Sequence, residues 1–212
     1  MRRRSTGLVA ALFAVVGGLL VGPATAGAAC PSQTLSKPFA AFGDLAPYFP
    51  VANGGFEGGS AGWSLAGGAS VVGGNETWQV GGAADSHALR LPIATGAVAT
   101  SPLFCVTMAT PTTRFFVRSD GFVTGSDWGY LSVEAQYSSR TGGANLGRFY
   151  LATVDRHDGA WTPTSPIALV VSGGLNGGMI ADANVRLIFT AHGAGRGNLT
   201  IDDVAVDPIK CC

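Results

Sequence analysis

The chain has 212 residues, of which 47% are hydrophobic and 12% are charged, and its 13 basic residues balance its 13 acidic ones. Three of the arginines fall in the first four positions, so removal of an N-terminal leader would leave a weakly acidic protein with a net charge of about −3. No basic stripe is present, which excludes nucleic acid as an expected partner.

Residues 1–29 have the pattern of a secretory signal peptide. Arginines at positions 2–4 precede the apolar run Leu8–Val21, which is too short to span a bilayer comfortably. Small residues at 24–28 then supply cleavage sites. We therefore expect a secreted or cell-surface protein; an uncleaved membrane anchor and a lipoprotein acylated at Cys30 are the alternatives.

The remaining residues divide into two segments. Residues 30–52, rich in proline and aromatic side chains, are expected to pack as an irregular N-terminal extension, and residues 53–212 are expected to form one domain. In that domain Gly-Gly pairs separate short apolar runs, because glycine adopts the positive φ angles of tight turns without steric cost. Eight or more short strands between such turns predict an all-β protein, a two-sheet antiparallel jelly-roll β-sandwich.

Alternation of apolar and polar side chains locates the strands. They are predicted, in chain order, at 70–72, 77–80, 88–91, 104–107, 114–118, 130–137, 148–154, 185–191 and 199–206. In the clearest of them Leu131 and Val133 would face the core, and Phe149 and Leu151 would do so in the next. In the last strand the alternation changes phase at Asp202-Asp203, which predicts a β-bulge.

Two short motifs stand at the ends of the domain. It opens with Asn53-Gly54-Gly55-Phe56-Glu57, followed by Gly62-Trp63, and it closes with Leu199–Pro208, which contains Ile201-Asp202-Asp203-Val204. Together they resemble the jelly-roll domains of the secreted bacterial carbohydrate-binding-module-like (galactose-binding-like) family. The resemblance implies that the fold brings the two chain ends together, and that Glu57 and Asp202 or Asp203 hold a structural calcium. Calcium prefers carboxylate and carbonyl oxygens; in the alternative, the aspartates bind backbone N–H groups at the bulge.

A second group of residues would form a sugar-binding face. Sugars present apolar C–H faces and rings of hydroxyl groups, so their sites combine an aromatic platform with bidentate polar groups. The outward side chains of the middle strands, with one tryptophan in the turn before them, have this composition: Trp128, Tyr130, Glu134, Gln136, Arg148, Tyr150 and Arg186. The expected partner is a polysaccharide or cell-surface glycan. In the alternative, this is a solvated face with ordinary ion pairs such as Glu134 with Arg148.

The four cysteines, Cys30, Cys105, Cys211 and Cys212, are expected to form disulfides in an exported protein, and four cysteines allow three connectivities. A bond between the adjacent Cys211 and Cys212 would be strained, and we expect Cys30 to pair with Cys105. No C-x-x-C motif or histidine cluster accompanies them, so zinc is not expected.

Catalysis has little support in the sequence. A glycosidase needs two carboxylates across a cleft, and nothing in the pattern marks the candidate pair Glu134 and Asp127. The favoured interpretation is a secreted, non-catalytic carbohydrate-binding domain with no cofactor other than calcium. The alternatives are a structural or protein-interaction module of the cell envelope and, third, a polysaccharide-active enzyme.

Overall fold

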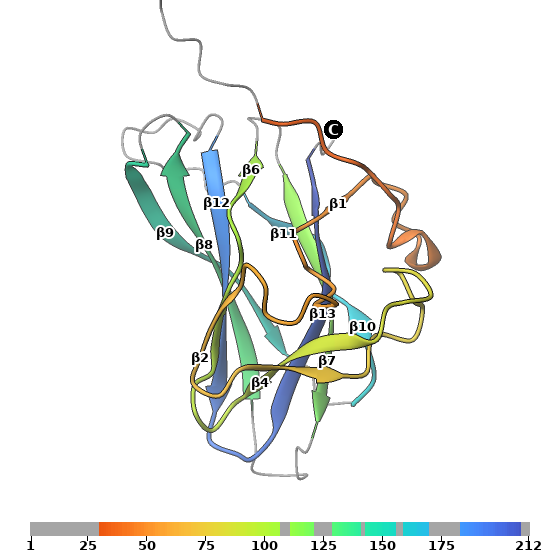
Figure 1. Cartoon of the computed structure of the whole chain (residues 1–212). Coiled ribbons are helices and arrows are strands. Elements are labelled where there is room, and N and C mark those ends of the chain that lie inside the picture. The colour runs from red at the N-terminus through yellow and green to blue at the C-terminus, as the bar shows by residue number, and fades with distance from the viewer. Residues whose placement is uncertain are drawn as a thin grey trace, which may run out of the picture.

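The computed structural model describes residues 30–106, 111–120, 129–140, 143–155, 159–169 and 183–208. Over these residues two antiparallel sheets pack face to face as a jelly-roll β-sandwich (Figure 1), which confirms the predicted fold class. The one helix among them is the short 3₁₀ turn η1 (Ala40–Phe42), which has neither the length nor the apolar stretch needed to cross a membrane. The expected signal peptide, residues 1–29, lies outside the described residues.

The first sheet contains the closing strand of the domain. Across the sheet its strands are β10 (Thr162–Pro163), β7 (Thr112–Asp120), β13 (Asn198–Asp207), β4 (His87–Pro92) and β3 (Ser70–Gly73). Two short strands add to them: β1 (Phe49–Pro50) pairs with β13, and β11 (Ile167–Ala168) pairs with β7. The closing strand β13 is therefore central, with partners on both sides.

The second sheet contains the middle strands of the sequence. Across the sheet its strands are β2 (Ser64–Ala66), β5 (Val98–Thr100), β12 (Ala183–Gly193), β8 (Gly129–Ser139) and β9 (Asn145–Asp155), and β6 (Phe104–Val106) pairs with β12. The long strands β12, β8 and β9 lie side by side (Figure 1). Within the described part of the chain, β9 forms the edge of this sheet.

The inner faces of the two sheets form an apolar core. Alternate side chains of β8 are buried in it, as predicted: Leu131, Val133, Ala135 and Tyr137. From the neighbouring strand, Phe189 meets Phe115 of the opposite sheet with ring centroids 5.2 Å apart, and Trp63 of the opening motif packs on Phe189 as well. Burial of such large side chains between the sheets is the main source of stability of the sandwich.

A bulge changes the alternation of β9. Its register against β8 shifts between the pairs Val133–Ala152 and Glu134–Tyr150, so Leu151 is the inserted residue. Phe149 and Leu151 pack against the core as expected, although both are only partly buried. After the bulge, toward the C-terminal end of β9, the alternation of inward and outward side chains is reversed. Odd-numbered residues of the strand therefore lie on the outer face there.

The closing strand contains the predicted bulge. Its register against β7 shifts between Asp202 and Ala205, and Asp203 adopts a φ of +46°. Asp and Asn tolerate this left-handed conformation better than most residues. The inserted residue returns Val204 and Val206 to the core face of the strand, where both are fully buried.

The strand predicted at residues 77–80 is wrong, because this segment forms turns. The cause is the side chain of Glu76, whose two carboxylate oxygens accept hydrogen bonds from the backbone N–H groups of Trp78 and Val80. These bonds curl the backbone and take the place of a strand ladder. Trp78 packs through its ring on Phe116 of β7.

The N-terminal extension is more regular than expected. Besides η1 and β1 it contains a bridge between Ser36 and Tyr48, and Phe39 and Tyr48 are buried against the first sheet. A disulfide joins Cys30 to Cys105, the pairing that we expected, and so attaches the start of the extension to β6. Cys211 and Cys212 lie outside the described residues.

Candidate functional site

The outer face of the second sheet brings together side chains from three neighbouring strands. Across β12, β8 and β9 the register aligns Arg186 with Gln136 and Arg148, Ile188 with Glu134 and Tyr150, Thr190 with Ser132 and Thr153, and His192 with Tyr130 and Asp155. We call these four rows the three-strand face. They contain six of the seven residues predicted for a sugar site; the seventh, Trp128, lies outside the described residues.

Two tyrosines of the three-strand face are exposed to solvent. Tyr150 is 60% exposed and Tyr130 is 41% exposed. The Tyr130 ring stacks on His192 with centroids 4.8 Å apart, and Nε2 of His192 lies 2.8 Å from Oγ of Ser132. The Tyr150 hydroxyl lies 2.6 Å from Oγ1 of Thr153. Both rings are therefore oriented by polar neighbours while one face of each remains available to a ligand.

His192 is a member of the face that the sequence analysis missed. In the sequence His192 follows an apolar run and precedes a Gly-rich segment, a pattern that predicts a loop. It reaches the face because β12 extends to Gly193 and the register sets His192 opposite Tyr130. Only the pairing of strands 60 residues apart in the sequence supplies that information.

The charged residues of the face differ in their partners. Nη2 of Arg148 donates a hydrogen bond to Oε2 of Glu134, so the ion pair considered in the sequence analysis is present. The Arg148 side chain nonetheless remains 52% exposed. Arg186 is exposed and has no hydrogen bond or ion pair within the part of the chain that the structure describes. The Arg186 guanidinium is thus fully available to a ligand, and the Arg148 guanidinium is partly available.

Of the two residues considered for catalysis, the structure describes one. Glu134 is engaged by Arg148, and Asp127 lies outside the described residues. The segment Gly58-Gly59-Ser60-Ala61-Gly62 has the letters of the G-x-S-x-G nucleophile motif, but it forms turns. That motif requires a sharp turn between a strand and a helix to present its serine.

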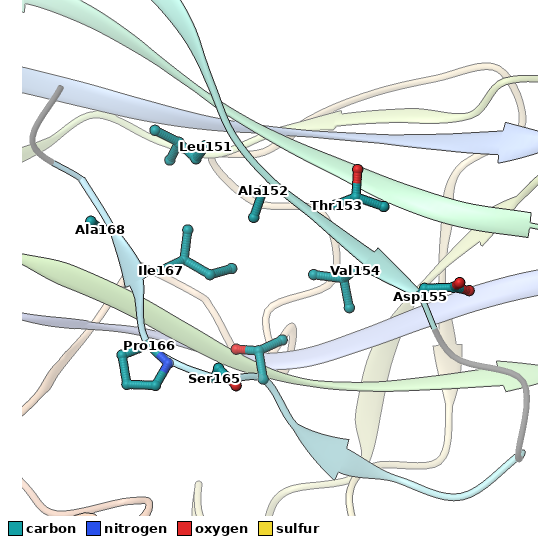
Figure 2. Close-up of a pocket in the computed structure, with 10 residues that line it drawn as sticks. Leu151, Ala152, Thr153, Val154, Asp155, Ser165, Pro166, Ile167 and Ala168 are labelled. Atoms are coloured by element: carbon teal, nitrogen blue, oxygen red, sulfur yellow. The ribbon is translucent and has the colours of Figure 1, made fainter.

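A groove opens beside the three-strand face, between the edge strand β9 and the short strand β11 of the other sheet (Figure 2). Its volume is about 460 Å³. The side chains of Leu151, Ala152 and Ile167 lie between the two strands, and Asp155 is the one charged residue in its lining. Asp155 and Thr153 also belong to the three-strand face, so groove and face form a continuous surface around the edge of the sandwich.

An acidic group lies where the closing strand meets the loop between β3 and β4. One carboxylate oxygen each of Glu76, Asp85 and Asp203 lies within 4.8 Å of the others. Asp85 is 6% exposed, and neither of its carboxylate oxygens has a hydrogen-bond partner of normal geometry in the described part of the chain. The same is true of Oδ2 of Asp203. Buried carboxylate oxygens without partners are costly, and a cation held by the three carboxylates could compensate their charge.

Glycine backbone surrounds the acidic group. A Cβ at Gly81 would lie 3.0 Å from Cγ of Asp85. A Cβ at Gly55 would contact the carboxylates of Asp203 and Asp85. The backbone N–H of Val204 donates to the carbonyl of Gly54 at 3.1 Å. The opening motif and the closing strand are thus joined here, as the family resemblance implies.

Two carboxyl groups of the acidic group, those of Asp203 and Asp85, have raised pKa values. Burial, together with the charges of Asp85 and Glu76, raises the pKa of Asp203 to about 7. Burial raises the pKa of Asp85 too, although the nearby Asn75 side chain and Gly81 backbone lower it in part. Carboxylates this close repel one another unless protons or a cation lie between them. The donor set consists of oxygen atoms only, from one loop and one β-bulge, and it suits calcium rather than a softer metal.

Two of the expected calcium ligands have other partners. Burial alone would raise the pKa of Glu57, but its oxygens accept hydrogen bonds from residues 86–87, including both backbone N–H groups at 2.7 Å, and the pKa is lowered to about 2. Asp202 is fully buried and accepts the N–H groups of Glu76 at 3.2 Å and of Asp203 at 2.8 Å. Of the three expected ligands, only Asp203 belongs to the acidic group.

Comparison with known proteins finds resemblance in fold. No family model matches the sequence, and no curated protein matches it. Among solved structures, a family 16 carbohydrate-binding module shares 14% identity at a TM-score of 0.48, covering 74% of this chain and 97% of that one. A family 61 carbohydrate-binding module in complex with β-1,4-galactotriose shares 15% identity at a TM-score of 0.42, covering 73% and 94%. The tailspike protein 4 enzymatically active domain of bacteriophage CBA120 shares 14% identity at 0.47, covering 76% and 21%.

These similarities are too distant to assign any residue a role. The fold class rests on the two sheets of the chain itself. In that fold the chain is similar to carbohydrate-binding modules, the class of domain that the two end motifs resemble.

Proposed function

We propose that this protein is a secreted, non-catalytic carbohydrate-binding domain whose ligand lies across the three-strand face. The observation that supports this most directly is the pair of exposed tyrosines, Tyr130 and Tyr150, set among amide, hydroxyl and guanidinium groups on three adjacent strands. Exposed aromatic rings stack on the C–H faces of sugars, and the polar groups between them bond to hydroxyls.

The arrangement of the rings supports a chain-like ligand. Tyr130 and Glu134 are four residues apart on β8, and Tyr150 lies opposite Glu134. At about 3.4 Å per residue, the backbone positions of the two tyrosines are separated by roughly 14 Å along the strand direction. This distance exceeds the size of one sugar ring, so the two platforms suit different residues of an oligosaccharide.

We further propose that the acidic group holds a structural calcium ion. Glu76, Asp85 and Asp203 would supply carboxylate oxygens, and the adjoining backbone would complete the oxygen shell. The support is the set of buried, unpartnered oxygens of Asp85 and Asp203. The bound ion would compensate their charges and attach the loop between β3 and β4 to the closing strand.

The binding proposal is tested by measuring the affinity of the purified protein for a panel of soluble polysaccharides. Tyr130→Ala and Tyr150→Ala should each weaken binding about tenfold or more, since aromatic anchors contribute on the order of 1–2 kcal/mol. Tyr150→Phe keeps the ring and should retain most of the affinity. Leu45→Ala, which removes an exposed apolar side chain on the N-terminal extension, is the matched control.

Three results would contradict the proposal. Failure of the folded protein to bind any polysaccharide would favour an interaction module of the cell envelope. Binding that survives both tyrosine substitutions would remove the three-strand face as the site. Release of shorter sugars from a bound polysaccharide would show that the protein is an enzyme.

A further inference from the structure

We infer that the carbohydrate recognised by this protein is acidic, and that Arg186 and Arg148 bind its anionic groups. The inference rests on the proposed function, because it assigns a ligand class to the same three-strand face. It goes beyond hydroxyl recognition by naming a charge that the ligand must carry: a carboxylate, sulfate or phosphate on the glycan.

The first support is the register. Arg186 on β12, Gln136 on β8 and Arg148 on β9 form one row across the sheet. Neighbouring strands are about 4.8 Å apart, so the backbones that carry the two arginines are separated by roughly 10 Å. The amide of Gln136 lies between them. Two guanidinium groups and one amide therefore point from a single row, next to the row that contains Tyr150.

The second support is the state of each guanidinium. Arg186 is exposed and without a partner among the described residues, so all five of its N–H donors are available. Arg148 donates from Nη2 to Glu134, and the other N–H groups of its guanidinium lie on a side chain that is about half exposed. Arginine binds planar and tetrahedral oxyanions in bidentate fashion, which hydroxyl groups do not require.

Two other arginines of the structure, Arg114 and Arg118, show what a structural role looks like in this protein. Arg114 is buried against Asp44, and Arg118 lies over the ring of Trp161 with its Cζ 4.8 Å from the centroid. Each has a defined partner that accounts for it. Arg186 lacks one although it lies on the middle strand of the three-strand face, where a ligand across the tyrosines would pass.

The third support is the separation of charge along the face. The Arg186 row and the adjoining Glu134 row carry two positive charges and one negative charge. Three rows from the Arg186 row along β8, the row of Tyr130 contains Asp155. An anionic group on the ligand is therefore expected at the arginine end, and an uncharged sugar residue on the Tyr130–His192 stack.

The test compares ligands that differ only in charge. The purified protein is titrated with polygalacturonate and with its methyl ester, which has the same backbone without the carboxylates, and with dextran sulfate and dextran as the sulfate arm. We expect binding to the charged member of a pair to be at least tenfold tighter, and to weaken as salt is raised because counterions screen the contacts. Preference for the carboxylate pair or the sulfate pair identifies the anionic group.

Substitutions make the test specific to this row. Arg186→Gln should weaken binding of the charged polysaccharide about tenfold, as expected for loss of a charge-assisted hydrogen bond. It should weaken binding of the uncharged one much less, because the glutamine amide still donates to hydroxyl groups. Glu134→Gln should tighten binding of the charged polysaccharide, because it frees Arg148. Arg90→Gln, on the other sheet, changes the net charge by the same amount as Arg186→Gln and should have no effect.

The outcomes separate this inference from the proposed function. Equal binding of charged and uncharged polysaccharides, abolished by Tyr130→Ala, would overturn the inference and leave carbohydrate binding intact. An equal loss with Arg90→Gln and Arg186→Gln would show non-specific attraction and would also overturn it. No binding to any polysaccharide would overturn both.

Discussion

Calcium should stabilise this protein through the acidic group, and the effect can be predicted in size and in sign. In the structure Asp85 and Asp203 place buried oxygens without partners beside Glu76. The folded protein offers this site, whereas the unfolded chain separates the three carboxylates. A ligand that binds only the folded state raises the free energy of unfolding by RT ln(1 + [L]/Kd).

The magnitude follows from that relation. At a calcium concentration about 100 times the Kd, the stabilisation is about 2.7 kcal/mol. In a domain of roughly 180 residues, each kcal/mol raises Tm by about 2–4 °C. We therefore expect calcium to raise Tm by about 5–11 °C above the value measured in EDTA.

The assay is thermal unfolding followed by circular dichroism, with calcium or with EDTA. Asp203→Asn should abolish the calcium effect, and because Asn tolerates the positive φ of this position, the backbone is not strained by the change. Asp85→Asn should abolish it as well. In EDTA the Asp85→Asn variant should be at least as stable as the wild type, since it removes an uncompensated buried charge.

The control is Glu57→Gln. Glu57 bonds to the backbone of residues 86–87 and is outside the acidic group, so this variant should lose some stability in both conditions but keep the calcium-dependent rise in Tm. The reasoning would be refuted by a Tm that is the same with calcium and with EDTA. A rise that survives Asp85→Asn and Asp203→Asn but disappears with Glu57→Gln would instead place the ion at Glu57.

Three further predictions concern the frame that supports the site. Phe189→Ala should destabilise the protein by about 3–5 kcal/mol, because it opens a cavity between the sheets, and a denaturation midpoint near that of the wild type would contradict this packing. Cys105→Ser should cost about 4 kcal/mol, since the disulfide closes a loop of 75 residues, and urea unfolding with and without a reducing agent checks it: the reducing agent should lower the stability of the wild type and leave the variant unchanged. Burial alone would raise the pKa of Asp44, but hydrogen bonds from Tyr48, the backbone N–H of Ala46 and Arg114 hold it below its ordinary value. The stability that Asp44 contributes is therefore present above the ordinary pKa and is lost as the pH falls through the lower folded pKa. Asp44→Asn should be destabilising at neutral pH, and the difference from the wild type should shrink as the pH is lowered below the ordinary pKa.

Local patterns in the sequence were enough to predict much of the sandwich. The alternation in 130–137 predicted which side chains of β8 are buried, and the change of phase at Asp202-Asp203 predicted the bulge of β13. Both features depend on the period of a strand, which is a property of the local backbone. The prediction failed at 77–80, where apolar residues suggested a strand and Glu76 instead bonds to the backbone and forms turns.

The candidate face was predicted in part for the same reason. An outward position follows from alternation, and so Tyr130, Glu134 and Gln136 were placed correctly relative to one another. His192 was missed because its membership depends on which residue of β8 it opposes. Strand register is set by contacts between distant segments, and one strand read by itself does not contain it.

By itself, the sequence determined the two-sheet class, the periodicity of the strands and the residue types available for a site. Only the tertiary structure decided which carboxylates meet. Glu76 and Asp85 lie in a Gly-rich loop, and Asp203 lies in a bulge more than 100 residues later. Packing of that loop on the closing strand brings one carboxylate oxygen of each residue within 4.8 Å of the others. Glu57, which belongs to the opening motif, bonds instead to the backbone at 86–87. The physical reason is that local structure depends on the preferences of residues that are neighbours in the sequence. A group of buried carboxylates depends instead on packing between distant segments, which holds these carboxylates together against their electrostatic repulsion.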